Sequence, residues 1–425
     1  MSERVPEGWK LDRLGSLCSS IRGVSYRPEN LHSTKSKHTA TLLRSNNIQE
    51  IGLNFKDVQY VDIHKVKSKQ IAIEGDIAVC MSNGSKRLVG KNSPFAAVWG
   101  SETFTVGAFC SIIRTNENST HKFVKHLLKS NAFTRQVEFS LAGSAINNLK
   151  DGDVENYTFR IPPIPEQKKI ASILTSVDEV IEKTQSQINK LQDLKKATMN
   201  ELLTKGIGHT DFKDSELGRI PKSWKITELS KVSMILSSNV DKKTIENETS
   251  VSLCNYTDVY KNLIITREIN FMKASAKKSE INKFLIKKDD VIITKDSETP
   301  DDIAISSYVS EDFDNVLCGY HLSIIRSNKS VVDGKFLSLF FKLDYTRHRF
   351  SILANGTTRF GLNLKEIENS KILVPSLEEQ KKIANIIFSL DDEISTITKK
   401  FNKYIFLKKS LMQDLLTGKV RVSVN

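Results

Sequence analysis

The six residues Glu-Gln-Lys-Lys-Ile-Ala at positions 166–171 return unchanged at positions 379–384. The repeat reaches further in both directions. Pro-x-x-Trp-Lys occurs at 6–10 and 221–225, Ser-Ile-Ile-Arg at 111–114 and 323–326, and Leu-Leu-Thr at 202–204 and 415–417. A repeat of this length predicts two structural units that fold alike and are related by approximate two-fold symmetry.

The two halves are not alike everywhere. Residues 22–100 and 237–315 share almost no identity beyond scattered apolar positions. A preserved frame with divergent interiors is expected if two copies of one scaffold carry different recognition surfaces.

Composition restricts the kind of partner. The 425 residues exceed what one hydrophobic core usually supports, and the formal net charge is +13. A basic excess attracts nucleic acid phosphates or anionic lipid. Because no run of about 18 apolar residues predicts a membrane span, we expect double-stranded DNA and not a membrane, although solubility alone would also explain such a charge. Five well-separated cysteines without a Cys-x-x-Cys pair fit reduced thiols in the cytoplasm.

Each half predicts a mixed α/β domain followed by a long helix. Apolar runs bounded by turn residues predict strands at 76–81 and 109–114, and in the second half at 290–294 and 322–325. Apolar residues at helical spacing follow, from Phe123 to Val137 and from Phe336 to Leu343. We therefore expect an α+β chain. Its two pseudo-symmetric α/β domains, at 1–160 and 209–373, are separated by two long antiparallel helices at 161–208 and 374–425.

The long helices begin after prolines and carry apolar residues at a sustained spacing of three to four. This pattern favours an antiparallel coiled coil that acts as a spacer; a helix packed on its own domain is the alternative. About 38 helical residues would span ~57 Å, enough to separate two DNA-binding domains by one duplex turn of ~34–36 Å. Gly206 with Gly208, and Gly418, are expected to end the helices. The residues expected to form the spacer and dock partners are Ile170, Val177, Leu191, Leu194, Ile383, Leu390, Ile397 and Leu411.

The sequence carries no recognisable catalytic or metal-binding motif. Residues 84–92 resemble a phosphate-binding loop, but five residues instead of four separate the glycines, and Asn92 stands where Ser or Thr would bind magnesium. Ile161 precedes the Pro-Pro pair at 162–163, so the Asn/Asp-Pro-Pro-aromatic motif of amino-methyltransferases is absent. His121 and His126 lack the separation of helical zinc ligands. We expect a chain without catalysis, cofactor or metal of its own.

The repeated frame resembles the specificity subunit of type I restriction–modification enzymes along essentially the whole chain. The resemblance rests on the Pro-x-x-Trp-Lys openings, on segments 161–167 and 374–380 that enter the helices, and on the Leu-Leu-Thr endings. It implies two target-recognition domains, each of which reads one half of a bipartite DNA sequence, and paired helices that set the spacer and dock two methyltransferase subunits. It also implies that S-adenosylmethionine, ATP and magnesium belong to those partners and to the restriction subunits. Residues 21–26, 44–48 and 81–86 are similar to a branch of the family that reads an AAC-type half-site.

Base recognition in the major groove requires Arg or Lys for guanine and Asn or Gln for adenine, presented on a rigid scaffold. Residues 83–91 offer such side chains with two glycines that allow close approach of the backbone. For each candidate, a solvated surface position is the alternative. The candidates are Arg22, Arg44, Asn46, Asn47, Asn83, Lys86, Arg87 and Lys91 in the first half, and Tyr256, Lys295, Tyr320 and Arg359 in the second.

Two other functions stay open from the sequence. A coiled-coil adaptor that binds proteins instead of DNA would have the same frame, but the basic charge favours DNA. A fragment of a fused restriction–methylation enzyme is disfavoured because both halves contain the full repeat.

Overall fold

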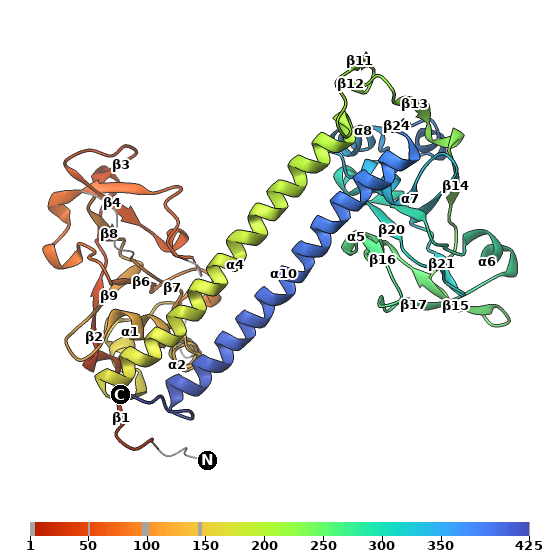
Figure 1. Ribbon diagram of the computed structural model, residues 1–425. Coiled ribbons are helices and arrows are strands. Elements are labelled where there is room, and N and C mark those ends of the chain that lie inside the picture. Colours follow the sequence, from red (N-terminus) through yellow and green to blue (C-terminus); the bar gives the residue numbers. More distant parts are fainter. Residues whose placement is uncertain (1–4, 50–51, 96–101, 143–146, 425) are drawn as a thin grey trace. The chain divides into compact units, whose positions relative to one another are not determined.

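The computed structural model describes residues 5–49, 52–95, 102–142 and 147–424 (Figure 1). The chain forms two compact units. Unit 1 comprises Met1–Ser186 together with Lys399–Asn425, and unit 2 comprises Gln187–Thr398. Each long helix is therefore divided near its middle, and the domain limits expected at 160, 208 and 373 stay predictions.

Unit 1 is built on two four-stranded sheets. The first has the order β2-β9-β6-β7 and is antiparallel; the second has the order β3-β5-β4-β8, with β4 parallel to β8, and β1 pairs with β10. The strands are β1 Lys10–Arg13, β2 Cys18–Arg22, β3 Leu31–His32, β4 Thr39–Leu43, β5 Gln59–Asp62, β6 Ile77–Cys80, β7 Asn92–Pro94, β8 Phe104–Val106, β9 Cys110–Thr115 and β10 Thr158–Ile161. The helices are α1 His121–Leu128, α2 Asn131–Ala142, α3 Asp151–Glu155 and α4 Ile164–Lys205.

Unit 2 repeats this plan. Its five-stranded sheet has the order β14-β22-β18-β20-β16, a second sheet has the order β17-β15-β21, and β13 pairs with β24. The strands are β11 Phe212–Ser215, β12 Gly218–Pro221, β13 Lys225–Glu228, β14 Ser233–Ser237, β15 Thr249–Cys254, β16 Ile264–Ile265, β17 Met272–Ala276, β18 Asp290–Thr294, β19 Asp296–Ser297, β20 Ser306–Val309, β21 Val316–Cys318, β22 Leu322–Ser327, β23 Phe360–Gly361 and β24 Lys371–Val374. The helices are α5 Tyr256–Lys261, α6 Lys278–Phe284, α7 Gly334–Phe340, α8 Asp344–Leu353, α9 Leu364–Glu368 and α10 Leu377–Thr417.

The same buried ion pair crosses the central sheet of each unit. Arg114 on β9 contacts Asp76 over 2.6 Å, and Arg326 on β22 contacts Asp290 over 2.7 Å. Both aspartates have side chains that are 2% exposed. The repeated Ser-Ile-Ile-Arg sequence therefore places equivalent arginines on equivalent strands, and the expected strands at 76–81, 109–114, 290–294 and 322–325 are confirmed with small shifts at their ends.

The helical spacing after β9 and β22 does not give one helix in either unit. In unit 1, Ser130 ends the first helix and starts the second: its hydroxyl donates to Leu127 O over 2.6 Å and accepts from Phe133 N over 3.2 Å. In unit 2, Leu343 is the capping residue of α8, so it lies beyond the end of α7. The apolar spacing is continuous because both helices cover the same core.

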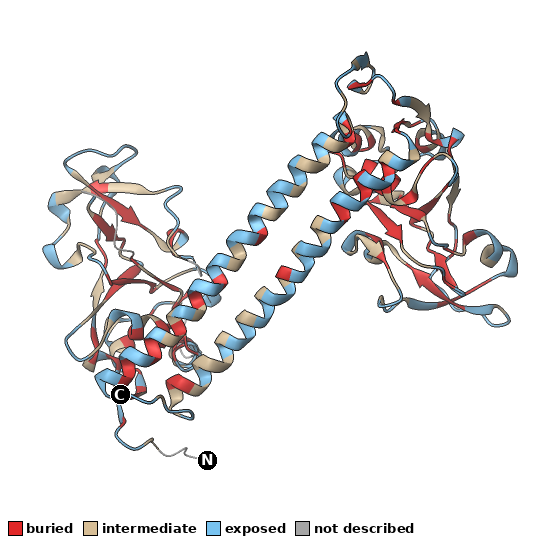
Figure 2. Ribbon diagram, in the orientation of Figure 1, coloured by how far each residue is buried: buried red, intermediate tan, exposed pale blue. Residues whose placement is uncertain are grey.

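The long helices α4 and α10 run antiparallel within each unit. In unit 1, Lys408 Nζ lies 2.5 Å from Asp178, while Leu415 packs in the core cluster that contains Ile170. In unit 2, Lys195 Nζ lies 2.5 Å from Asp391, so later residues of one helix again meet earlier residues of the other. Figure 2 shows exposed residues along much of both helices. The expected fold class is confirmed.

Two glycines end the long helices, as expected. Gly206 follows α4 with φ of 68°, and Gly418 follows α10 with φ of 73°, a conformation that glycine adopts without strain. A Cβ at Gly206 would stand 2.4 Å from Glu379 Oε1, and one at Gly418 would stand 2.4 Å from Pro6 Cγ. Because glycine has no side chain, the backbone at each of these positions can lie close to a residue of the repeated frame, Glu379 or Pro6.

Candidate nucleic-acid interface

Two predicted DNA-reading loops lie together in unit 1. Asn83 follows β6, and its Nδ2 donates to Ser45 Oγ over 3.3 Å. Ser45 begins the 3-10 turn Ser45–Asn47 that follows β4. The structure therefore brings Arg44, Asn46, Asn47 and Asn83 together.

Asp57 holds the polar side chains of the first loop. Its Oδ2 accepts from Arg44 Nη2 over 3.1 Å and from Asn46 Nδ2 over 3.0 Å. Asn47 is buried instead, and its Nδ2 donates to Asn54 O over 2.9 Å. Asn47 thus shapes the loop, while Arg44 is half-buried and Asn46 is exposed; a contact of any of them with DNA stays a prediction.

Lys86 and Arg87 are exposed cations in the second loop. Both lie in the 3-10 turn Lys86–Leu88, and Lys91 beyond it is half-buried. Among the described residues, neither Lys86 nor Arg87 has an ion-pair partner. Within the described residues, no atom lies within 4 Å of a Cβ added at Gly84, while Gly84 O accepts a hydrogen bond of 3.0 Å from Asn147 Nδ2. This loop combines exposed positive charge with an open glycine position, which suits a phosphate or base contact.

Arg22 is engaged inside unit 1. Its Nη2 donates to Leu149 O over 2.9 Å, and its Nε lies 3.5 Å from Asp151 Oδ2. Asp151 also accepts hydroxyl hydrogen bonds of 2.6 Å from Ser20 and Ser111. Arg22 therefore braces α3 against the sheet, and its predicted contact with DNA competes with this internal role.

Lys295 is engaged in a similar way in unit 2. Its Nζ donates to Ser238 O over 2.6 Å and to Ser237 Oγ over 3.2 Å. Burial lowers the pKa of the Lys295 ammonium group. The predicted base contact of Lys295 would have to replace these hydrogen bonds.

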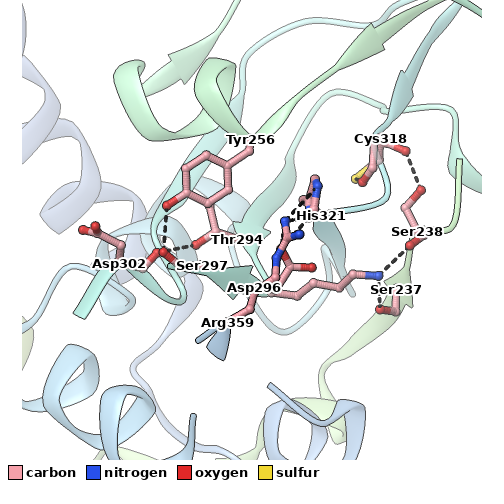
Figure 3. Close-up of polar contacts among 12 residues, drawn as sticks. Ser237, Ser238, Tyr256, Thr294, Asp296, Ser297, Asp302, Cys318, His321 and Arg359 are labelled. Atoms are coloured by element: carbon pink, nitrogen blue, oxygen red, sulfur yellow. Dashed lines mark hydrogen bonds and ion pairs between the residues drawn. The ribbon is translucent and has the colours of Figure 1, made fainter. Parts of the chain in front are cut away.

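Asp296, His321 and Arg359 converge in unit 2 (Figure 3). Because β18 and β22 are antiparallel, with Thr294 opposite Leu322, the residues after β18 and before β22 meet at one edge of the sheet. Asp296 Oδ1 forms a short hydrogen bond with His321 Nδ1. Strand β19, the residue before β22 and the residue before β23 therefore meet at this cluster of side chains.

The Arg359 guanidinium stands over the imidazole face. Its Nη2 lies 2.9 Å from His321 Nδ1 and 3.1 Å from Nε2, and such similar distances to both ring nitrogens exclude an in-plane contact. Burial lowers the pKa of His321, which favours the neutral ring beneath a cation. These contacts hold the guanidinium end of the long, exposed Arg359 side chain.

The two predicted tyrosines flank this cluster. The Tyr320 ring centroid lies 3.6 Å from that of His321. The hydroxyl of Tyr256 lies 3.2 Å from Ser297 Oγ, and its ring stacks on Tyr260. The structure thus gathers all four predicted residues of unit 2 in one region, although no DNA contact is tested by this proximity.

The equivalent position in unit 1 carries different chemistry. The backbone N–H of Met81 donates to Phe109 O over 2.8 Å, as that of Lys295 donates to His321 O over 3.0 Å. Met81 therefore corresponds to Lys295, and Phe109, which is 69% exposed, corresponds to His321. One backbone frame therefore carries Met and Phe in unit 1 and Lys and His in unit 2.

Sequence reasoning missed Asp296 and His321, because neither belongs to a motif. The available signal was the repeat itself: at positions where the frame is preserved, Ser82 and Phe109 of the first half are replaced by an acid and an imidazole in the second. Among the described residues, no group of three or more His, Cys, Asp or Glu is arranged to bind a metal.

The predicted spacer residues differ in how far they are buried. Ile170 and Ile383 lie in the cores of units 1 and 2 respectively, so the first turns of both helices pack on their own unit. Leu194 is 52% exposed. The remaining residues are buried (Ile397) or half-buried (Val177, Leu191, Leu390 and Leu411).

Two units with one frame and different polar clusters, on a basic chain, are the features expected of a protein that recognises DNA sequence. The family described as type I restriction modification DNA specificity domain matches residues 6–193 and 221–405. The chain therefore belongs to this family, and its role in DNA recognition within a type I restriction–modification system is confirmed.

Relatives match nearly the whole chain. It is 29% identical over 438 aligned residues to the putative type I restriction enzyme MjaX specificity subunit of Methanocaldococcus jannaschii, covering 98% of this chain and 95% of that protein. It is 23% identical over 434 aligned residues to the type I restriction enzyme EcoKI specificity subunit of Escherichia coli, covering 98% and 89% respectively.

Solved structures share the fold. The S subunit of a type I restriction–modification system from M. genitalium has a TM-score of 0.58 at 15% identity, covering 97% of this chain and 98% of that chain. A chain from a study of the assembly of a type I restriction–modification system has a TM-score of 0.56 at 16% identity, covering 98% and 100%. In the described part of the chain, no helix has the length and apolarity needed to cross a membrane.

Proposed function

We propose that this chain is the DNA-recognition subunit of a type I restriction–modification complex, and that units 1 and 2 each read one half of a bipartite duplex target. The observation that carries the proposal is the preserved frame with exchanged side chains, such as Phe109 in unit 1 against His321 in unit 2. If both units recognised the same base sequence, they would carry the same side chains at these equivalent positions. The net charge of +13 supports attraction to DNA phosphates.

The long helices are proposed to set the spacer and to dock two methyltransferase subunits. Their exposed apolar side chains support a protein partner, because water contact at such groups is unfavourable. Phe406 is 72% exposed. The other exposed apolar residues on these helices are Ile164, Val180, Leu194, Ile386, Ile405 and Leu407. We place methyl transfer with S-adenosylmethionine, and restriction with ATP and magnesium, in the partner subunits of a cytoplasmic complex.

Base-resolution methylation mapping of the host, with and without the gene, tests recognition. Loss of one bipartite N6-methyladenine motif on deletion is expected, together with restoration by the intact gene. A host whose expressed system shows no change in any motif would contradict DNA recognition and favour a protein-binding adaptor.

Lengthening both helices tests the spacer. Leu203 lies in the core of unit 2, so four residues are better inserted after Ser186 in α4 and after Thr398 in α10, where the two units meet in sequence. A helical turn adds ~6 Å, so the recognised gap is expected to grow by about one to two base pairs of ~3.4 Å each. An unchanged gap with retained half-sites would show that the helices do not set it.

A further inference from the structure

The cluster of Asp296, His321 and Arg359 carries a more specific inference, which rests on the proposed function. We propose that Arg359 reads a guanine in the half-site of unit 2, and that Asp296 and His321 are positioning residues that hold its guanidinium (Figure 3).

Arg359 is anchored at one atom and open at the others. Its Nη2 contacts His321 and lies 3.3 Å from Asp296 Oδ1, and its side chain is 57% exposed. Within the described residues, Nη1 and Nε make no hydrogen bond. A guanidinium has five N–H donors, and guanine presents O6 and N7 as paired acceptors in the major groove. The free donors therefore suit this base.

A purely structural ion pair has a different form in the same unit. Arg326 binds Asp290 through two hydrogen bonds, Nε at 2.8 Å and Nη2 at 2.7 Å, and the aspartate side chain is 2% exposed. In the cluster, Asp296 Oδ1 already bonds to His321 Nδ1, and Arg359 makes a single longer contact with the same oxygen. These contacts restrain the Arg359 guanidinium but, within the described residues, leave Nη1 and Nε available to bind a ligand.

The support under Arg359 is rigid. The His321 residue is 8% exposed, is fixed by Asp296 on one side and lies against the Tyr320 ring on the other. A held side chain loses less conformational freedom when it binds, which strengthens discrimination between bases. Lys295 is not an equivalent candidate, because its ammonium group is committed to Ser238 O.

The test uses the full chain purified with its methyltransferase partners. Selection from randomised duplexes gives the base preference at every position of both half-sites. The wild type is expected to require guanine at one position of one half-site, and to bind less well when 7-deazaguanine, which lacks the N7 acceptor, replaces that guanine. Arg359→Ala and Arg359→Lys are expected to lower the guanine preference there by roughly 10- to 100-fold and to leave the other half-site unchanged.

The positioning role is tested with residues that the fold already accepts. Asp296→Ser and His321→Phe introduce the side chains found at the equivalent positions of unit 1, Ser82 and Phe109. Both variants are expected to lower the guanine preference at the same position by roughly 3- to 10-fold and to reduce the effect of 7-deazaguanine. Loss of preference at every position of that half-site would instead show a role in folding and would overturn the positioning claim.

A phosphate contact gives a distinct result. Two results would overturn the guanine contact. In the first, Arg359→Ala weakens binding to all duplexes equally and lowers the slope of log affinity against log salt concentration by about one. In the second, the base preferences stay unchanged. A wild type without any bipartite preference would contradict the proposed function itself, so the two failures are distinguishable.

Discussion

The indole Nε1 of Trp9 donates a hydrogen bond of 2.9 Å to Glu166 Oε2, and the equivalent bond of 3.1 Å joins Trp224 to Glu379 in unit 2. The partners in each pair are more than 150 residues apart. The repeated Trp and Glu of the sequence are thus two ends of one contact, which closes each unit at the start of its long helix.

Replacing the donor of this contact is expected to loosen one unit at a time. Trp9→Phe keeps the ring but leaves a buried carboxylate oxygen with one partner fewer, a loss of about 1–2 kcal/mol. Hydrogen exchange should quicken in residues 164–176 and 411–422 and stay unchanged in unit 2, and Trp224→Phe should give the converse. The control Phe139→Ala removes a side chain that is 83% exposed and should change neither unit. Equal loosening of both units by either variant would contradict the expectation.

The Glu166 carboxylate makes the stability of unit 1 depend on pH. Burial would raise the pKa of Glu166, but hydrogen bonds from Arg421 and Trp9 outweigh it and leave the pKa below the usual value. Its contribution is therefore complete above the unfolded value of about 4.5 and is lost as the pH falls through the lower folded value. Glu166→Gln should be less stable at neutral pH and should lose less stability between about pH 5 and 3, as measured by hydrogen exchange. Parallel pH profiles for the two proteins would rule out this role.

The contact between Asp178 and Lys408 is expected to stabilise the helix pair in unit 1. Asp178 is 8% exposed as a residue and also meets Lys125 over 3.2 Å, so Asp178→Asn leaves two partly buried ammonium groups without their anion. A loss of about 1–3 kcal/mol is expected, seen as faster exchange in residues 171–186 and 399–412. Glu378→Gln removes an exposed ion pair with Lys382 on α10 and serves as the control, with no measurable change expected. Equal effects of both variants would show that burial of the pair does not matter.

Arg87 is the exposed cation of unit 1 whose removal should alter DNA discrimination. If it reads a base, Arg87→Ala weakens binding to the cognate duplex by about 1–3 kcal/mol and relaxes one position. Arg135, on α2, is exposed but lies outside the predicted loops, so Arg135→Ala is the matched control. Unchanged discrimination between cognate and mismatched duplexes removes Arg87 from the candidates.

The cysteine thiols are expected to be unreactive in the folded chain. All five are buried and free, and burial raises the pKa of Cys18 and Cys110 to about 12. Because the thiolate is the nucleophile, iodoacetamide at pH 8 should label them only after unfolding, as read by mass spectrometry. Labelling of native protein at the rate of a free thiol would show that a cysteine is accessible.

The sequence predicted the parts of the fold that the repeat preserves, because those residues make the closing contacts. Strands β9 and β22, which carry the repeated Ser-Ile-Ile-Arg, and the glycine ends of α4 and α10 belong to this set. The sheet β3-β5-β4-β8 was not predicted, since it lies where the halves diverge and its strands alternate weakly. The break at Ser130 was missed because apolar spacing continues across two helices that share one core.

The candidate site was predicted less completely for a physical reason. Polar residues on loops were identified by type, but their partners are set by tertiary contacts. Asp57, which binds Arg44 and Asn46, and Asp296, which binds His321 from 25 residues away, have no local signal. Burial of Asn47 likewise depends on how its loop closes.

Unit 1 contains residues that follow unit 2 in the sequence. Leu415 and Leu416 are buried in its core, and Arg421 binds Glu166, whereas unit 2 is drawn from one continuous stretch. During synthesis, every residue of unit 2 has therefore been made before the last segment of unit 1 exists. Residues 1–186 of unit 1 are made before unit 2, but residues 399–425 are made after it, so the core of unit 1 is the second of the two to have all its contributing residues.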